Sequence, residues 1–387
     1  MTEKISKISS NPSYMTGTGA DCSTMSALAG GDLSSMKNQR HIGEISESGG
    51  MAENLCDSTN RRWVFYKTGT GADCCAMSAL TGVGLTSMES QRHIGEADCR
   101  RLPTFKIMEC TLRDGGNVNG SWFDEGLARR IVECADGAGA DIIEVGYKNS
   151  DKFCSRTQFG EFRFCDEDLI KRITEGVSAE ISVLVDCGRC EPAAFLPAGQ
   201  SAVDLVRCAF YARDSAEALR VLAVLKDKGY KTAACMMAAS TIGESLSEKV
   251  AEIAGSSAVD IVYLMDSYGA LLPDEFAEMA KMYGAVCAEN GKLFGVHSHD
   301  NLQCAFANEL AGISAGARIA DCTIGGLGNG AGNCRAELLF GILRGADAAA
   351  RIAEFAQREI EPIKAKFGCA PYPKYMLAAL ANTKVRK

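Results

Sequence analysis

Between residues 105 and 344, the chain alternates between short apolar runs and longer amphipathic stretches. Near-continuous apolar runs of this length are typical of parallel strands that are buried on both faces. We therefore expect eight consecutive β-then-α units, with strands at 105–112, 141–147, 181–186, 204–210, 230–237, 260–266, 292–299 and 318–325.

The stretches between these runs predict helices, and 273–290 is the clearest of them. Pro273 suits a first helical turn, and the acidic residues that follow it lie near the positive end of the helix dipole. Apolar residues from Phe276 to Cys287 then recur at helical spacing and predict one buried stripe. The stretches 124–138 and 214–228 have similar patterns.

Eight such units within 240 residues match the size of a (β/α)8 TIM barrel, an α/β fold. An open, doubly wound sheet is the alternative, but it normally begins with a glycine-rich turn and has fewer strands. We predict a catalytic TIM barrel over 104–345. A short C-terminal helical extension should follow over 346–387, with helices near 347–366 and 372–381.

The N-terminal region, 1–103, contains a duplication: 16–44 recurs as 68–96, with 21 of 29 positions identical. The unit is rich in Gly, Ser, Thr and Met, and two copies are fewer than a stacked solenoid needs. We predict that this region is largely disordered, with short helices near 26–28 or 85–91 as its best ordered pieces. Its TGTGAD segment lacks the preceding strand and the Gly-Lys-Ser/Thr of a phosphate loop.

Composition indicates a globular protein: 47% of the residues are hydrophobic, 23% are charged and the net charge is −8. Nucleic acid is disfavoured because it requires a concentrated basic face. No apolar run is long enough for a membrane span, and no secretory signal is evident, so we expect a cytoplasmic location. Most of the 18 cysteines should be buried or idle thiols. For Cys187 and Cys190, a redox or zinc role is the alternative.

Two of the four histidines, His297 and His299, are separated by one residue at the end of the seventh apolar run. Side chains two apart on a strand point to the same side, so both imidazoles can face one ion. Asp114 follows the first run, which we take as the neighbouring strand of the ring. We predict a divalent metal site of Asp114, His297 and His299, for Mn, Zn, Fe or Mg. A hydrogen-bonded histidine pair is the alternative.

Arg113 precedes the proposed ligand Asp114 at the expected barrel mouth. It could form a salt bridge to a neighbouring strand, for instance to Glu144, or act as a fixed cation beside a developing oxyanion. The glycine-rich run at 325–333 would let backbone N–H groups approach an anionic substrate.

Four motifs together resemble the metal-dependent aldolase and lyase barrels, the DRE-TIM metallolyases. They are TLRDG at 111–115, IEVG at 143–146, HSHDN at 297–301 and GLGNGAGN at 326–333. This HMG-CoA lyase-like family includes 4-hydroxy-2-oxovalerate aldolase, hydroxymethylglutaryl-CoA lyase and the isopropylmalate and homocitrate synthases. The segments 204–214, 266–271 and 371–380 look closest to the aldolase branch.

The resemblance implies that Asp114, His297 and His299 bind the metal, with Asn333 as a further ligand. Mn²⁺ or Mg²⁺ is the expected ion, with Zn²⁺ or Fe²⁺ as alternatives. It also implies a metal-stabilised enolate of a 2-oxo acid such as pyruvate, with Arg113 stabilising the enolate and Gly328 and Gly330 near the substrate. The C-terminal helices would contact a second copy or a partner dehydrogenase.

One position departs from the aldolase branch, which has a histidine as general base three residues after the motif aspartate. This chain has Asn117 there, and an amide cannot accept a proton at neutral pH. Water, Tyr147, Tyr268 or a carboxylate would have to replace the base, or the reaction differs.

The leading hypothesis is therefore an aldolase or C–C lyase acting on a 2-oxo acid. A Claisen-type synthase joining an acyl-CoA to a 2-oxo acid is the first alternative, which the short region after the barrel disfavours. A non-catalytic barrel that binds a partner is the second.

Overall fold

The computed structural model describes residues 52–56, 62–66, 79–80 and 105–384. The chain divides into two compact units, Met1–His93 and Ile94–Lys387. The prediction that the N-terminal region is disordered, and the short helices near 26–28 and 85–91, lie outside the described residues.

The described part of the first unit is a three-stranded sheet, which was not predicted from the sequence. Strand β1 (Ala52–Cys56) pairs antiparallel with β2 (Arg62–Tyr66), and β2 pairs with β3 (Ala79–Leu80). β1 and β2 lie between the two copies of the repeat. The segment Arg62–Tyr66 reads RWVFY, a run of aromatic and β-branched residues that favours a strand.

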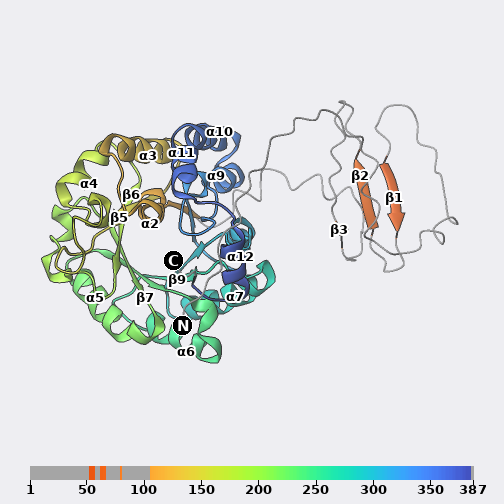
Figure 1. Ribbon diagram of the computed structural model, residues 1–387. Helices are drawn as coiled ribbons and strands as arrows, with labels where there is room; N and C mark the ends of the chain where they lie inside the picture. The colour runs from red at the N-terminus through yellow and green to blue at the C-terminus, as the bar shows by residue number, and fades with distance from the viewer. Residues whose placement is uncertain (1–51, 57–61, 67–78, 81–104, 385–387) are drawn as a thin grey trace, which may run out of the picture. The chain divides into compact units, whose positions relative to one another are not determined.

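Eight parallel strands in the second unit close into a barrel, which confirms the predicted fold. Around the ring their order is β10-β11-β4-β5-β6-β7-β8-β9, and Figure 1 shows helices surrounding them. The strands are β4 (Lys106–Glu109), β5 (Ile142–Tyr147), β6 (Glu180–Asp186), β7 (Leu205–Phe210), β8 (Lys231–Met236), β9 (Ile261–Asp266), β10 (Leu293–Ser298) and β11 (Ile319–Cys322).

Successive residues of each strand pack on opposite sides of the barrel wall. On β4, Ile107 belongs to the large outer cluster under the helices, whereas Met108 belongs to a smaller cluster with Tyr263, Met265 and Ile319. Because side chains alternate along a strand, this smaller cluster fills the barrel interior. The interior is thus a packed core, and chemistry is confined to the barrel ends.

Seven of the eight strands are followed by an α-helix on the outer face: α3 (Glu125–Gly137), α4 (Glu167–Ile173), α5 (Ser215–Asp227), α6 (Leu246–Ala254), α7 (Pro273–Glu289), α8 (Ala305–Ser314) and α9 (Ala336–Arg344). The predicted helix α7 buries Phe276, Ala280, Tyr283 and Cys287, as its spacing indicated. The β6–β7 connection differs from the expected β-then-α pattern: it contains only the 3₁₀ turns η5 (Pro192–Ala194) and η6 (Ala198–Gln200). Pro192 and Pro197 leave no room for a longer helix between them.

The first and last barrel strands are shorter than predicted. β4 ends at Glu109, and the residues that were expected to continue it form the helical turn α1 (Thr111–Asp114), followed by α2 (Gly116–Asn119). Likewise β11 ends at Cys322, and the 3₁₀ turn η10 (Ile324–Gly326) begins the glycine-rich run. Periodicity missed both ends because helical turns at the mouth are as apolar and buried as the strands.

The C-terminal extension is helical, as predicted. It consists of α10 (Ala346–Phe355), the π-helical segment η11 (Ala356–Ile360), α11 (Glu361–Phe367) and α12 (Pro373–Leu380). Lys364 donates to the Gly325 carbonyl oxygen at 2.6 Å, and the Cys369 sulfur lies 3.2 Å from the Gly328 carbonyl oxygen. The extension therefore packs against the glycine-rich run.

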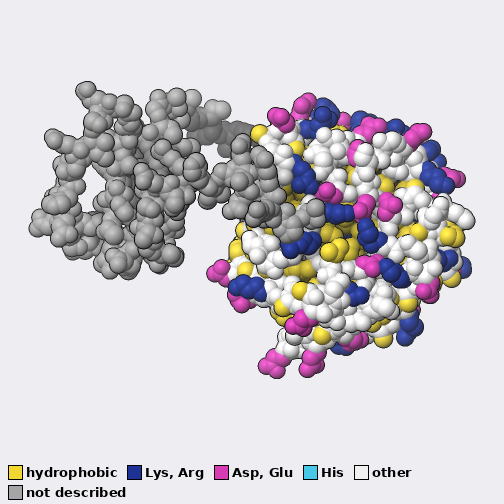
Figure 2. All heavy atoms as spheres, turned by 180° about the vertical axis from the view of Figure 1, so that it is seen from behind, with side chains coloured by type: hydrophobic (Ala, Val, Ile, Leu, Met, Phe, Trp, Pro, Cys, Tyr) yellow, Lys and Arg dark blue, Asp and Glu magenta, His cyan; other side chains and the backbone are white. Residues whose placement is uncertain are grey.

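Charged side chains of both signs are interspersed on the face drawn in Figure 2. Among the described helices, none combines the length and apolar character that crossing a membrane requires. Cys187 is half-buried and Cys190 is buried, and both are free thiols.

Candidate metal centre

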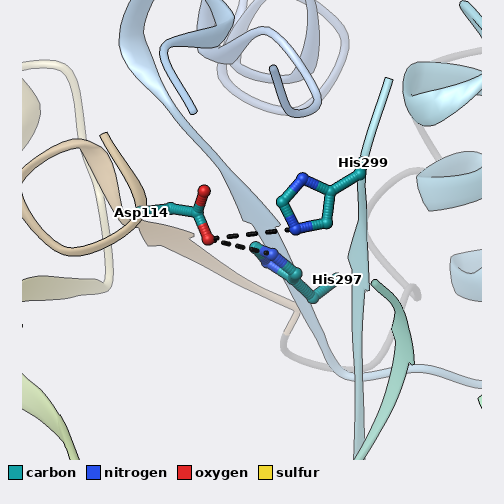
Figure 3. A group of neighbouring side chains, drawn as sticks. All are labelled: Asp114, His297 and His299. Atoms are coloured by element: carbon teal, nitrogen blue, oxygen red, sulfur yellow. Dashed lines mark ion pairs between the residues drawn. The ribbon is translucent and has the colours of Figure 1, made fainter. Parts of the chain in front are cut away.

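The predicted ligands Asp114, His297 and His299 lie together at the barrel mouth (Figure 3). All three are buried, and each offers one ligand atom within 4.8 Å of the others. The Oδ2 atom of Asp114 lies 3.6 Å from Nε2 of His297 and 4.0 Å from Nε2 of His299. The two rings meet edge to face, with centroids 5.2 Å apart, and no hydrogen bond joins them in this part of the chain. The alternative prediction, a hydrogen-bonded pair of histidines, is therefore wrong.

The ring position of Asp114 differs from the expectation. β10, which carries His297, is not adjacent to β4, because β11 lies between them. Asp114 ends the helical turn α1 rather than a strand, five residues beyond Glu109. This extension of the backbone lets the carboxylate reach the two imidazoles across the intervening strand.

His297 is oriented by a carboxylate behind it. Its Nδ1 atom lies 3.0 Å from Oδ2 of Asp321. Burial would raise the pKa of Asp321, but Arg207 and His297 outweigh it and lower that pKa, so the carboxylate is ionised and accepts the Nδ1 proton. Nε2 of neutral His297 then carries the lone pair. It is buried and has no hydrogen-bond partner among the described residues, which is the arrangement of a metal-ligating histidine.

Asn333 places an amide oxygen beside this group. Its Nδ2 donates to the Leu327 carbonyl oxygen at 3.3 Å, whereas Oδ1 is buried without a partner in the described structure. Asn333 also forms a β-bridge with His299, which holds it beside the ligands. Two imidazoles, a carboxylate and an amide oxygen fit a divalent transition metal or Mg²⁺.

The glycine-rich run packs directly on these ligands. A Cβ atom on Gly328 would lie 2.1 Å from Asn333 Nδ2 and 2.9 Å from Asp114 Oδ1. Gly330 has φ +70°, and a Cβ there would lie 2.4 Å from Asn301 Oδ1. Glycine is required at both positions because the backbone approaches neighbouring polar atoms too closely for any side chain.

Electrostatics prepare Asp114 and His299 for a cation. Burial alone would raise the pKa of Asp114, but Arg113 and the two histidines hold that pKa well below its usual range. Burial lowers the pKa of His299 to about 4, so its imidazole is neutral at pH 7. For His297, burial would lower the pKa, but the neighbouring carboxylates of Asp114 and Asp321 raise it above its ordinary value. A metal at Nε2 would therefore compete with a proton for His297 more than for an ordinary histidine.

Arg113 combines both roles considered from the sequence. Its Nε atom lies 2.5 Å from Glu144 Oε2, and its Nη1 atom pairs with Asp114. Its Nη2 atom is buried with no hydrogen-bond partner among the residues described. The salt bridges fix the side chain, and one N–H group remains for a substrate oxygen.

Two residues of this site were missed in the sequence. Arg207 is fully buried in the barrel interior, where it binds Glu144 at 2.5 and 2.6 Å and Asp321 at 2.6 Å. This network connects Arg113 to His297 through Glu144, Arg207 and Asp321. Its signal was visible, because a charged residue interrupts each of the apolar runs 204–210 and 318–325.

The other predicted catalytic residues divide into two groups. The Tyr147 hydroxyl donates to Asn117 Oδ1 at 3.1 Å, and burial raises the pKa of Tyr147, so these two side chains meet at the mouth. Tyr268 contacts Asn301 through its backbone carbonyl oxygen, at 2.9 Å. Its hydroxyl has no hydrogen-bond partner among the described residues, so no hydrogen bond ties its side chain to the proposed ligands.

Comparison with known proteins agrees with this architecture. The family model described as HMGL-like matches residues 104–361. Over 246 residues the chain is 29% identical to 4-hydroxy-2-oxovalerate aldolase of Pelotomaculum thermopropionicum, a match covering 63% of this chain and 71% of the relative. Over 240 residues it is 31% identical to the enzyme of that name from Streptomyces tendae, covering 62% of this chain and 66% of the relative.

Solved structures share the fold. Hydroxymethylglutaryl-CoA lyase from Pseudomonas aeruginosa superposes with a TM-score of 0.54 at 20% identity, covering 73% of this chain and 99% of that one. The carboxyl transferase domain of Rhizobium etli pyruvate carboxylase gives a TM-score of 0.56 at 15% identity, covering 76% of this chain and 54% of that one. The family model covers the whole barrel, including all the proposed metal ligands. This chain therefore belongs to the HMGL-like family.

Proposed function

We propose that this protein is a divalent-metal-dependent aldolase, a carbon–carbon lyase that cleaves or forms a 4-hydroxy-2-oxo acid. The observation that carries the proposal is the buried group of Asp114, His297 and His299, with His297 Nε2 and Asn333 Oδ1 lacking partners among the described residues. The 4-hydroxy-2-oxovalerate aldolases among its relatives support this reaction class.

Asp114, His297, His299 and Asn333 would hold the cation, for which we propose Mn²⁺ or Mg²⁺, with Zn²⁺ or Fe²⁺ as alternatives. When bound, it would act as a Lewis acid toward the substrate's keto and carboxylate oxygens. His297 and His299 supply neutral nitrogen ligands, and Asp114 supplies the negative charge.

Arg113 would stabilise the charge that develops when the bond between C3 and C4 breaks. The electron pair of that bond moves toward the keto oxygen, and the free Nη2 atom can donate to an oxygen there. Glu144 and Asp114 hold the guanidinium in place beforehand, so little reorganisation is needed during the reaction.

The proton of the C4 hydroxyl needs an acceptor, and Asn117 cannot serve. Tyr147 donates its own proton to Asn117, and its raised pKa keeps the phenol protonated. We therefore propose that a water molecule at the mouth takes this proton, with Asn117 and Tyr147 positioning it.

The test uses the purified full chain. We expect pyruvate to be released from 4-hydroxy-2-oxo acids, and pyruvate alone to exchange its methyl protons with deuterium oxide, measured by NMR. His297→Ala and His299→Ala should lose both activities together with the metal, measured by elemental analysis. If acyl-CoA and a 2-oxo acid instead release a free thiol, the Claisen-type synthase is the correct function. No turnover at all would support a binding role.

We further propose that the C-terminal helices contact a second subunit, either another copy or a partner dehydrogenase. Leu377 and Leu380 on α12 are 60% and 66% exposed, and Ile342 on α9 is 65% exposed. Exposed apolar side chains that gather on helices favour an interface. Light scattering of the wild type and of Leu377→Asp/Leu380→Asp would show whether α12 holds an oligomer together. The cytoplasm remains the expected location.

A further inference from the structure

Arg163 lies at the barrel mouth, with its guanidinium over the Tyr147 ring. It ends the 3₁₀ turn η4 (Glu161–Arg163), which belongs to the connection after β5. Its Nη2 atom lies 3.4 Å from Asn117 Oδ1, and its Nη1 atom lies 3.8 Å from Oδ2 of Asp186, the last residue of β6. The metal-site function above makes no use of this residue.

Three arginines are buried in the described part of the chain, and Arg163 differs from the other two in its partners. Arg113 and Arg207 each bind two carboxylates through salt bridges of 2.6 Å or less. Arg163 has no hydrogen-bonded carboxylate. Its distance of 3.8 Å to Asp186 exceeds a hydrogen bond, and the same Asp186 oxygen already accepts from Asn149 at 2.9 Å.

The surroundings of Arg163 are those of a cation kept available for an anion. Its guanidinium stacks over the Tyr147 ring, 4.0 Å from the centroid, and lies 4.8 Å from that of Phe159. Stacking holds the plane in place but uses none of its N–H groups. Only 8% of the residue is exposed, and Nε has no hydrogen-bond partner among the residues described. A buried guanidinium in this state is costly unless a ligand supplies the missing acceptor.

The position of Arg163 relates it to the substrate. Arg113 and Asp114 are close enough to Tyr147 to influence its pKa, with burial as the largest effect, and Arg163 stacks on the same ring. Both Tyr147 and Arg163 contact Asn117, which follows Asp114 by three residues, so Arg163 lies beside the end that would hold the 2-oxo acid. The part of a 4-hydroxy-2-oxo acid that becomes the aldehyde would extend toward Arg163.

We propose that Arg163 binds a second carboxylate of the substrate, so that the substrate class is a 4-hydroxy-2-oxo dicarboxylic acid. This inference rests on the proposed aldolase function and names its substrate. The bond between C3 and C4 breaks, its electron pair becomes the enolate of pyruvate, and C4 becomes an aldehyde that carries the distal carboxylate. The C4 hydroxyl proton leaves to water, and C3 gains one proton.

The experiment compares kcat/KM for 4-hydroxy-2-oxovalerate with those for 4-hydroxy-2-oxoglutarate and 4-hydroxy-2-oxoadipate. We expect the wild type to favour one dicarboxylate over the monocarboxylate by about tenfold to hundredfold, the range of one charge-assisted hydrogen-bonding contact. Arg163→Met should lower kcat/KM for that dicarboxylate by a similar factor more than for 4-hydroxy-2-oxovalerate, mainly through KM. Arg163→Lys should fall between the two, because it keeps the charge without the planar fork.

Arg156→Met is the matched control. Arg156 lies in the same connection and stacks on Phe164, but it is exposed and binds Asp166 at 3.0 Å with two nitrogens, so its removal should not change the preference. Thermal denaturation of each variant shows whether it is folded. If Arg163→Met does not fold, the comparison of the wild type with Arg163→Lys decides.

Deuterium exchange of pyruvate distinguishes a failure of this inference from a failure of the proposed aldolase function, because exchange needs only the proposed metal site and not Arg163. If the wild type exchanges pyruvate protons but shows no preference for either dicarboxylate, the role of Arg163 is wrong and the aldolase function stands. Equal losses on all three substrates in Arg163→Met also overturn it. If the wild type neither exchanges nor cleaves, the proposed function fails and this inference fails with it.

Discussion

His297 Nδ1 lies 3.0 Å from Asp321 Oδ2, and this same oxygen accepts a hydrogen bond from Arg207 Nη1 at 2.6 Å. One carboxylate oxygen therefore orients a ligand of the proposed metal and closes a buried salt-bridge network. The ligand geometry at the mouth thus depends on charges in the barrel interior.

Asp321→Asn should weaken metal binding by about tenfold to hundredfold, the usual cost of losing the group that orients a ligating histidine. The asparagine amide would face the Nδ1 proton either with its oxygen, a weaker acceptor than a carboxylate, or with its NH₂ group, which cannot accept it. Isothermal titration calorimetry with Mn²⁺ measures the effect. Asp260→Asn is a suitable control. Asp260 immediately precedes β9, binds Lys226 and is far along the chain from the proposed ligands. Unchanged affinity in Asp321→Asn would exclude this orienting role.

Metal affinity should fall as the pH falls through the raised pKa of His297. That histidine binds a proton in the metal-free protein at pH values somewhat above its ordinary 6.5, and the metal must displace it. His299, with a pKa of about 4, and Asp114, with a lowered pKa, compete with the metal only under more acidic conditions. Calorimetry in buffers of different ionisation enthalpy should detect up to one proton released near pH 6. Binding that is independent of pH from 5 to 8 would contradict this assignment.

The raised pKa of His297 affects the stability of the metal-free protein in the opposite direction: lower pH weakens metal binding but stabilises the metal-free fold. A group whose pKa is raised in the folded state stabilises that state fully at pH values below its unfolded-state pKa. This contribution is lost as the pH rises through its folded-state pKa. Without metal, the contribution of His297 should therefore be greater at pH 6 than at pH 8. Thermal denaturation of the wild type and His297→Gln at both pH values isolates it.

Arg113→Gln should keep the metal but reduce turnover by about a hundredfold to a thousandfold, the range for losing one preorganised donor to a developing oxyanion. Glutamine can still contact Glu144, which limits the damage to the buried network. Metal content and kcat are measured on the same preparation. A variant within twofold of wild type on its true substrate would show that Nη2 does not face the reaction.

Gly328→Ala should disrupt the centre although it changes no ligand. The added Cβ would need the space of Asn333 Nδ2 and Asp114 Oδ1, at 2.1 and 2.9 Å. We expect at least tenfold weaker metal binding, comparable to the loss of an orienting group. Gly199→Ala is the matched control, since a Cβ there meets nothing within 4 Å. Normal affinity in Gly328→Ala would mean that the run can shift without cost.

Asn117→His should increase retro-aldol activity by restoring a titratable base where the aldolase branch has one. One well-placed base contributes on the order of a hundredfold to ten-thousandfold. The nearby Arg163 cation, 3.4 Å from Asn117 Oδ1, should favour the neutral imidazole that accepts a proton. Activity should rise as the pH passes upward through the imidazole pKa. Fast wild-type cleavage of 4-hydroxy-2-oxovalerate would instead show that another base is already present.

The sequence allowed the barrel, its strand count and the grouping of Asp114, His297 and His299 to be predicted, because each has a local signature. Apolar runs mark strands buried on both faces, and His297 and His299 are two apart, a spacing that faces both rings to one side. One prediction about the ring was wrong: the strand that leads to Asp114 was expected beside the strand of His297, but β11 separates β10 from β4. Consecutive numbering does not show how far a helical turn such as α1 carries Asp114.

Arg207, Asp321 and Arg163 could not be assigned from the sequence in the same way. The roles of Arg207 and Asp321 depend on distant partners: His297 is 24 positions from Asp321, and Asp321 is 114 positions from Arg207. A charged residue inside an apolar run indicates that some buried partner exists, but not which one. For Arg163, the informative observation was the lack of a bonded carboxylate, which only the folded structure can provide.

The contacts between the C-terminal extension and the glycine-rich run affect the order in which the site can mature. Lys364 and Cys369, which hold the Gly325 and Gly328 carbonyl oxygens, follow all eight barrel strands in the chain. A growing polypeptide therefore contains every proposed ligand before it contains the residues that fix the backbone pressed against Asp114 and Asn333. The centre should acquire its final affinity only after the extension has been synthesised and has docked, so a nascent barrel would bind the ion weakly.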